Sequence, residues 1–239
     1  MTVWLNNPFD PLPGEGGRPL RYWLLARALV AAGHRVVWWS SDFHHLRKLR
    51  RRGERVCQAE GFEVRLVQTP AYASNIGWRR WRSHARYAAA WERLARQAVA
   101  DGALETPAVI VVSLPPLGVF DAAARLREAW GCRIVVDVQD VWPETFYQLL
   151  PPFLRERGPS MFARFHRMAA RAYGGADRVS AVCQRYAALA REKGGRTDAP
   201  AVFRLGAPLP EPVLREPQGA ARALRLCYLG NLGRSYDIR

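Results

Sequence analysis

The sequence predicts an α/β protein built on a doubly wound parallel sheet, and two observations carry that prediction. Short runs rich in β-branched residues alternate along the chain with stretches whose apolar residues recur at helical spacing. Such alternation is typical of strand–helix–strand units, in which crossover helices cover both faces of a parallel sheet. With 239 residues, 49% of them hydrophobic, the chain can bury the core of one large or two ordinary domains.

The strands and helices can be placed in order along the chain. The predicted strands span residues 3–5, 36–39, 64–67, 109–112, 134–138, 179–182 and 202–205. Helices are predicted around the apolar stripes 25–32, 87–98, 119–130, 162–172 and 187–193. Residues 43–60 are rich in arginine. We interpret this charge run as the solvated face of a further helix.

The composition changes after Gly206, and this change predicts the domain boundaries. Residues 1–206 form a first α/β domain, and the proline-rich residues 207–222 form a linker. Residues 223–239 begin a second domain with one strand and a glycine loop. Because a lone strand and loop cannot bury a core, we expect this chain to be a truncated product.

The net charge of +15 comes almost entirely from arginine. Since a bias so one-sided can follow codon usage, we discount it as direct evidence of nucleic-acid binding. Guanidinium groups bind phosphate oxygens bidentately, so a phosphate-bearing partner is expected. Residues 78–82 interleave tryptophan with arginine. That pattern suits a membrane interface, stacking on single-stranded nucleic acid, or plain surface.

Several classes of site have no signature in the sequence. The four cysteines are scattered, without zinc spacing, so no metal is predicted. The glycine loop within residues 6–19 is neither GxGxxG nor a P-loop, so no dinucleotide cofactor is predicted. Its glycines allow a tight turn or let amides approach an anion, and we favour the anion because a helix follows. No signal peptide or membrane span is visible, and we expect a cytoplasmic or peripheral protein.

Polar residues gather where the strand over 134–138 ends. Asp137, Gln139, Asp140, Trp142 and Glu144 fall within eight positions. Pro143 disfavours helical geometry at the residue before it, so this segment is predicted to be a turn. Open α/β sheets bind ligands at the carboxyl ends of their strands, which makes the segment a candidate site. A cluster that caps the following helix is the alternative.

Four motifs, in this order, give the chain a family resemblance. They are Gly16-Gly17; Ser113-Leu114-Pro115-Pro116; Asp137-Val138-Gln139-Asp140-Val141-Trp142-Pro143-Glu144; and Tyr228-Leu229-Gly230-Asn231-Leu232-Gly233. Together they span nearly the whole chain, and the D-x-W-P-E element is the most specific. The chain resembles the family 4 retaining glycosyltransferases of the GT-B fold, which pairs two Rossmann-like domains. The closest likeness is to the bacterial branch that builds surface polysaccharides on lipid carriers.

The resemblance implies transfer of a sugar from a nucleotide-sugar donor to a lipid-linked or saccharide acceptor, in a cleft between the two domains. It implies catalytic positions at Asp140 and Glu144, which would orient a hydroxyl of the acceptor, with the general-base role open. It implies a cleft lined by Glu15, Gly16, Gly17, Arg18, Ser113 and Trp142. It implies a donor-diphosphate site at Gly230, Asn231, Gly233 and Arg234. It implies no metal or other cofactor.

The resemblance also gives the basic segments a role. A lipid-pyrophosphate acceptor lies in an anionic membrane, where each cation near the surface contributes about 1 kcal/mol. We therefore expect a protein peripheral to the inner membrane face, docked through Trp78, Arg79, Arg80, Trp81 and Arg82. Arginines within residues 47–52 are expected to assist.

The sequence departs from the family in two ways. Many members have a histidine near the end of the fifth strand, where this chain has Gln139 and Asp140. The donor-side domain is absent beyond Arg239, so we expect the chain expressed alone to show no turnover. The alternatives are a non-catalytic binding module, a basic nucleic-acid-binding protein, and a sugar-nucleotide epimerase of the GT-B fold.

Overall fold

A computed structural model describes residues 1–74 and 77–206 of the chain. It contains a sheet of β1 (Thr2–Asn6), β2 (Arg35–Ser41), β5 (Val56–Ala59), β6 (Phe62–Val67), β7 (Val109–Leu114), β8 (Arg133–Val138), β9 (Arg178–Ala181) and β10 (Ala201–Val202). These strands pair in the order β10-β9-β8-β7-β1-β2-β6-β5. Neighbours in this order are parallel, except for the antiparallel pair of β5 and β6. The predicted doubly wound α/β fold is confirmed. The predicted linker and the predicted start of a second domain lie outside the described residues.

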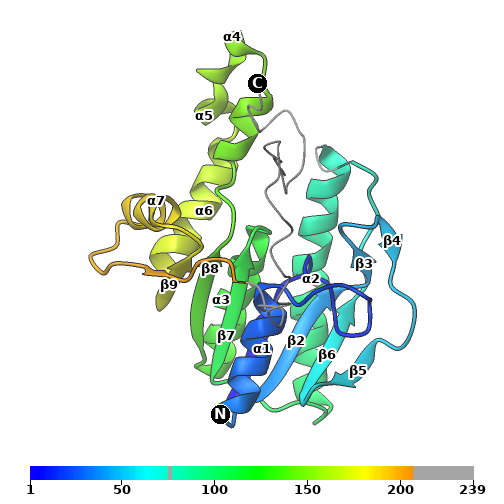
Figure 1. Cartoon of the computed structure of the whole chain (residues 1–239). Helices are drawn as coiled ribbons and strands as arrows, with labels where there is room; N and C mark the ends of the chain where they lie inside the picture. Colours follow the sequence, from blue (N-terminus) through cyan, green and yellow to red (C-terminus); the bar gives the residue numbers. More distant parts are fainter. Residues whose placement is uncertain (75–76, 207–239) are drawn as a thin grey trace, which may run out of the picture. The chain divides into compact units, whose positions relative to one another are not determined.

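Helices pack on both faces of this sheet (Figure 1). α1 (Arg21–Ala31) packs on one face, where Val3, Leu5 and Trp38 are buried. The other face, with Trp4 and Trp39, is covered by α2 (Trp78–Ala100), α3 (Gly118–Trp130), α6 (Ala163–Gly175) and α7 (Gln184–Gly194). Side chains alternate between the faces along each strand, so one strand supplies both cores. Shorter helices, η1 (Glu144–Leu149), α4 (Pro152–Arg155) and α5 (Gly158–Met161), join β8 to α6.

The prediction of a helix over residues 43–60 is wrong. The segment forms a small hairpin of β3 (Phe43–His44) and β4 (Leu49–Arg50), followed by β5 on the edge of the main sheet. The arginine run is not uniformly solvated, because the Arg51 side chain is only 3% exposed. Its guanidinium donates to the carbonyls of Ser41 and Asp10 and to the carboxylate of Glu15. These buried bonds hold the segment against the sheet, which a solvated helix face cannot do.

The last predicted strand is shorter than expected. β10 ends at Val202, and Phe203 and Leu205 are 60% and 68% exposed. The Phe203 carbonyl accepts a hydrogen bond of 2.6 Å from Arg21 Nη1. Because this carbonyl faces a side chain of α1, the strand does not continue through residues 203–205. Among the described helices, none is both long enough and apolar enough to cross a membrane.

Replacing Arg51 tests this account of the hairpin. We expect Arg51→Ala to lower the free energy of unfolding by about 3 kcal/mol, because it removes the bonds of a buried guanidinium to two carbonyls and leaves the partly buried Glu15 carboxylate without its cation. Arg52→Ala, at an exposed neighbour in the same segment, should change it by less than about 0.5 kcal/mol. Urea denaturation measures both values. Equal effects of the two substitutions would contradict the buried role of Arg51.

Candidate functional site

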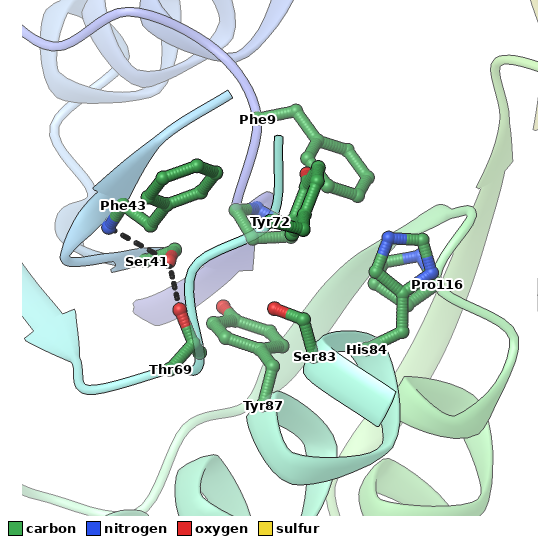
Figure 2. A pocket seen from close by; sticks show the side chains of 10 residues that line it. Phe9, Ser41, Phe43, Thr69, Tyr72, Ser83, His84, Tyr87 and Pro116 are labelled. Atoms are coloured by element: carbon green, nitrogen blue, oxygen red, sulfur yellow. Dashed lines mark hydrogen bonds between the residues drawn. The ribbon is translucent and has the colours of Figure 1, made fainter. Parts of the chain in front are cut away.

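The carboxyl ends of five parallel strands bring distant segments together at one edge of the sheet. The loops after β1, β2, β6, β7 and β8 leave the sheet there, and α2 begins beside them. Figure 2 shows a narrow slot at this edge, with Phe9, Phe43, Tyr72, His84 and Pro116 around it. The slot has room for about 10 Å³, roughly one water molecule. We therefore regard it as a packed wall of the site, not as a ligand cavity.

The hydroxyls inside the slot stiffen this wall. Ser41 Oγ and Thr69 Oγ1 lie 2.7 Å apart, and Ser41 Oγ accepts the Phe43 N–H (Figure 2). Tyr87 of α2 donates to the carbonyl of Trp39 at 3.1 Å. These bonds join the ends of β2 and β6 to α2.

Aromatic rings and cations form the outer rim of the same edge. We define the rim cluster as Phe9, His45, Lys48, Tyr72, Arg80 and Trp142. The Arg80 guanidinium lies 4.8 Å from the ring centre of Trp142 and 5.8 Å from that of Phe9. Lys48 Nζ lies 4.8 Å from the ring centre of Tyr72 and 3.4 Å from His45 Nδ1. His45 Nδ1 is in turn 2.6 Å from the Tyr72 hydroxyl.

The rim cluster concentrates positive charge in a partly buried place. Burial and the charge of Arg80 lower the pKa of Lys48. Burial also lowers the pKa of Arg80 itself. Burial, followed by repulsion from Lys48 and Arg80, lowers the pKa of His45 to about 3. Since these cations disfavour one another, an anion bound between them would relieve the repulsion. A phosphate-bearing ligand fits this arrangement.

Asp140 is tied to its own segment. Its Oδ1 accepts the Val141 N–H at 2.8 Å and the Thr145 hydroxyl at 2.9 Å. Its Oδ2 accepts the Trp142 indole N–H at 3.0 Å. The Trp142 ring stacks on His84 with centroids 5.1 Å apart. Residues 139–143 form the predicted turn. The bond from Thr145 joins two side chains and no side chain caps η1, so the alternative of a helix-capping cluster is not supported.

Glu144 has different partners from Asp140. Its carboxylate is paired with Lys193 of α7, and it lies 3.6 Å from His166 Nδ1 of α6. Tyr147 of η1 bonds to the same imidazole through its hydroxyl. The two predicted catalytic carboxylates thus share no partner, and Glu144 connects η1 to α6 and α7.

The glycine loop holds an internal ion pair beside exposed backbone. Glu15 accepts from Arg51 Nε and from the Leu12 N–H, each at 2.7 Å. Burial raises the pKa of Glu15 more than any one of these bonds lowers it, but the bonds together with the charge of Arg51 leave the pKa below its ordinary value. Gly16, Gly17 and Arg18 are exposed. Gly16 has a φ of 70°, a value that favours glycine.

The N-terminus of α1 is already occupied by a carboxylate of the chain. Asp10 is 7% exposed, and its Oδ2 accepts the Tyr22 N–H at 2.9 Å. Burial raises the pKa of Asp10. The expectation that this helix start binds an external anion is therefore wrong for the Tyr22 amide.

Ser113 lies at the end of β7 but is turned inward. It is 1% exposed, and its hydroxyl donates to the Pro115 carbonyl at 3.3 Å. Trp142 is also buried, yet it borders the rim cluster through Arg80. Of the predicted cleft residues, Trp142 joins the rim cluster, whereas Ser113 supports the loop that follows β7.

Sequence reasoning missed a buried ion pair on the α1 face of the sheet. Asp137 of β8 is 2% exposed and accepts from Arg21 Nε at 2.8 Å and Nη2 at 2.7 Å. Ser180 of β9 donates to the same carboxylate at 2.7 Å. The pair borders a cavity of about 690 Å³ whose lining is otherwise largely apolar, with Leu25, Val111, Val135 and Phe203. No sequence signal connects Arg21 with Asp137, which lie 116 positions apart.

Some side chains of the segment predicted to dock on membranes are exposed, and others pack against the protein. Trp78 is 64% exposed, and Arg79 and Arg82 are also exposed. Trp81 instead packs against Phe165, with centroids 4.6 Å apart, and Arg80 belongs to the rim cluster. Arg50 of β4 lies across a groove of about 440 Å³ from three arginines of α2, Arg82, Arg86 and Arg93. The hairpin and α2 thus share one basic groove.

Two further predictions, the donor-diphosphate site and the lack of a metal site, are not tested by the described residues. The residues predicted at the donor diphosphate, Gly230, Asn231, Gly233 and Arg234, lie outside the described part of the chain. Within residues 1–74 and 77–206, no group of three or more His, Cys, Asp or Glu side chains could hold a metal ion.

Comparison with protein families gives one match. Residues 16–206 match the family described as the glycosyl transferase 4-like domain. The matched range includes the glycine loop from Gly16, the rim cluster apart from Phe9, and both predicted catalytic carboxylates. No curated protein sequence matches the chain.

Comparison with solved structures finds a similar fold in the glycotransferase of kitacinnamycin. The glycotransferase of kitacinnamycin shares 16% identity and a TM-score of 0.50, over 91% of this chain and 55% of that one. A UGT transferase from Siraitia grosvenorii in complex with UDP shares 12% identity and a TM-score of 0.41, over 85% and 51% of the chains. A UDP-glucosyltransferase from Polygonum tinctorium shares 13% identity and a TM-score of 0.46, over 90% and 54%. The chain spans about half the length of these proteins.

The low pKa of His45 predicts a pH dependence of stability. In the unfolded chain a histidine protonates near pH 6.5, whereas folded His45 stays neutral until about pH 3. Between these values the unfolded state binds the additional proton, so stability is lost as the pH falls. We expect His45→Gln to reduce this loss, by at most about 1.4 kcal/mol per pH unit. Urea denaturation at pH 7 and pH 5 measures the difference. A His45 NMR signal that titrates near pH 6.5 in the folded chain would contradict the prediction.

Proposed function

The chain belongs to the family of glycosyl transferase 4-like domains, and from that premise we propose that it is the acceptor-side half of a retaining glycosyltransferase. The reaction moves a hexosyl or related sugar from a nucleotide-sugar donor to a lipid-linked or saccharide acceptor. Its setting is the synthesis of cell-surface polysaccharide, at the inner face of the membrane, to which the protein binds peripherally. A nucleotide-sugar, an acceptor and an anionic membrane surface are the proposed partners, and no metal or other cofactor is proposed.

The rim cluster is the observation that carries this proposal. Aromatic rings present flat apolar faces against which the C–H face of a sugar packs, and cations beside them bind phosphate. Arg80 and Lys48 each lie 4.8 Å from the ring centre of an aromatic residue in the cluster, Trp142 and Tyr72 respectively. An acceptor sugar joined to phosphate combines the two chemistries in one ligand. We therefore place the phosphate of the acceptor beside Lys48 and Arg80. The sugar is placed toward Phe9, which is only partly buried, because Tyr72 and Trp142 are 6% and 4% exposed.

The hydrogen bonds of Asp140 support a positioning role. Both of its oxygens accept bonds from its own segment, and one of these bonds holds the Trp142 ring. His45, whose pKa is about 3, is a weak base at neutral pH. The two observations favour a transfer in which neither Asp140 nor His45 removes the proton of the acceptor. In the proposed reaction the departing diphosphate takes up that proton as its own negative charge develops.

The remaining predicted residues have supporting roles in this proposal. Gly16, Gly17 and Arg18 border the reacting sugar or the phosphates of the donor, since all three residues are exposed in the loop that follows β1. Gly230, Asn231, Gly233 and Arg234 face the diphosphate, where amides and a guanidinium stabilise the charge that develops as it leaves. Glu144 fixes η1 against α7 through Lys193.

Loss of the rim cations tests the proposed acceptor site. The ligand is a short-chain polyprenyl pyrophosphate-linked N-acetylhexosamine, and its binding to the chain is measured by calorimetry. We expect Lys48→Ala and Arg80→Ala each to weaken binding by about tenfold, because each removes a charge-assisted bond to phosphate. Arg52→Ala, at an exposed arginine four positions from Lys48, should leave binding within about twofold.

The unphosphorylated sugar serves as the control ligand in the same assay. It should bind weakly and show no difference between the chain and the Lys48→Ala variant. If all variants bind the pyrophosphate-linked sugar as the unaltered chain does, the proposed acceptor site is wrong.

A further inference from the structure

The cavity of about 690 Å³ beside Arg21 and Asp137 has no part in the proposed function. Its volume falls within the range of about 300–1,000 Å³ that small-molecule sites occupy. The cavity lies on the α1 face of the sheet, where α1 covers buried residues of β1, β2 and β6. The floor of the cavity belongs to the next strands, β7, β8 and β9. A largely apolar cavity with a few polar groups at its edge is typical of a binding site for a small molecule.

Strand register orders the floor of the cavity into two rows. Val111, Val135 and Arg178 are neighbours on β7, β8 and β9, and they form the first row. Asp137 and Ser180 form the second row, nearer to the carboxyl ends of the strands. Because side chains two residues apart on a strand share one face, both rows face the cavity. The first row therefore changes from apolar on β7 and β8 to cationic on β9.

One wall of the cavity is a segment that arginines fix at both ends. Residues 198–203 follow α7 and return toward the start of α1, in orange in Figure 1. At one end, Arg196 binds the Asp198 carboxylate through Nε at 2.8 Å and through Nη2 at 2.9 Å. At the other end, Arg21 Nη1 donates to the Phe203 carbonyl at 2.6 Å. Since these bonds hold the wall in place, a ligand need not order it, and the entropic cost of binding is lower.

The polar groups at the cavity offer hydrogen-bond donors to a ligand. The Asp137 carboxylate already accepts from Arg21 Nε and Nη2, from Ser180 Oγ and from Gln139 Nε2. A carboxylate has about four acceptor positions, so Asp137 has none left for a ligand. Arg178 is exposed, and its Nη1 donates to a backbone carbonyl at 2.9 Å. A guanidinium carries more N–H groups than this one bond uses, so Arg178 retains donors for a ligand.

The charge of the lining also favours an anion. Asp137 is paired with Arg21, and Asp198 is paired with Arg196. Arg178 is the remaining charged residue of the lining. With both aspartates paired, the charge of Arg178 is left to be balanced by a ligand.

We propose that this cavity binds an amphipathic monocarboxylate of the size of a medium-chain fatty acid. The alkyl chain packs on Val111, Val135 and Leu25, and the carboxylate accepts hydrogen bonds from Arg178. A cationic ligand is disfavoured, because the carboxylates of the lining are already paired. The cavity shares no lining residue with the rim cluster, so this inference does not rest on the proposed function.

Calorimetric titration of the 239-residue chain with decanoate and with decanol tests the class of ligand. We expect decanoate to bind at least about fivefold more tightly than decanol, because only decanoate makes charge-assisted bonds to Arg178. Arg178→Ala should remove this difference by weakening the binding of decanoate. Arg185→Ala, at an exposed arginine of α7 on the opposite face of the sheet, is the matched control. It should leave the binding of both compounds within about twofold.

Filling the cavity tests where the ligand binds. Ala201 is an exposed residue of the wall, and Ala201→Trp should weaken decanoate binding by at least about tenfold, because the indole takes the space of the alkyl chain. Ala188→Trp, at an exposed position of α7, is the matched control and should stay within about twofold. Urea denaturation should show that both variants fold as the unaltered chain does.

Three results would overturn the proposal. The first is that the unaltered chain does not bind decanoate, or binds decanol as tightly. The second is that Ala201→Trp binds decanoate as the unaltered chain does. The third is a dimer in sedimentation that Ala201→Trp dissociates, since a second copy of the chain would then cover the cavity. None of these substitutions alters the rim cluster, so the acceptor assay judges the proposed function separately.

Discussion

Parallel pairing around β1 is the constraint on which the other features of this chain depend. β1 lies between β2 and β7, with both neighbours parallel to it. Each parallel neighbour requires a crossover, so the loops that follow the parallel strands emerge at the same edge of the sheet. The glycine loop, the β3–β4 hairpin, the start of α2 and the turn after β8 meet there although they are far apart in sequence. The rim cluster is the product of that geometry.

Charges at this edge serve two purposes. Arg51 with Glu15 joins the glycine loop to the segment after β4, and the buried pair of Arg21 with Asp137 joins α1 to β8. Lys48 and Arg80 lie among aromatic rings, and mutual repulsion adds to burial in lowering the pKa of Lys48. Pairs of the first kind stabilise the scaffold, whereas crowded cations of the second kind favour a bound anion. Family membership and this second set together connect the fold to sugar transfer.

Periodicity predicted the elements that bury a continuous apolar run. β1, β2, β6, β7, β8 and β9 and the five longer helices lie where the sequence places them, because their apolar residues repeat at strand or helix spacing. Residues 43–60 were predicted as a helix because a charge run does not reveal that one of its members, Arg51, is buried. Trp81 was assigned to the surface for the same reason, since its aromatic partners lie more than sixty positions later. Contacts set by tertiary structure, such as that of Arg21 with Asp137, leave no local pattern.

The most direct test of the acceptor site is a chemical-shift map of the labelled chain, titrated with the polyprenyl pyrophosphate-linked sugar. If the account is right, the shifts concentrate on the His45 and His84 imidazoles, the Trp142 indole and the amides near Lys48. Binding of the pyrophosphate should also raise the pKa of His45, because an anion offsets the repulsion from Lys48 and Arg80. Shifts confined to the cavity beside Arg21 and Asp137, with the rim cluster unchanged, would contradict it.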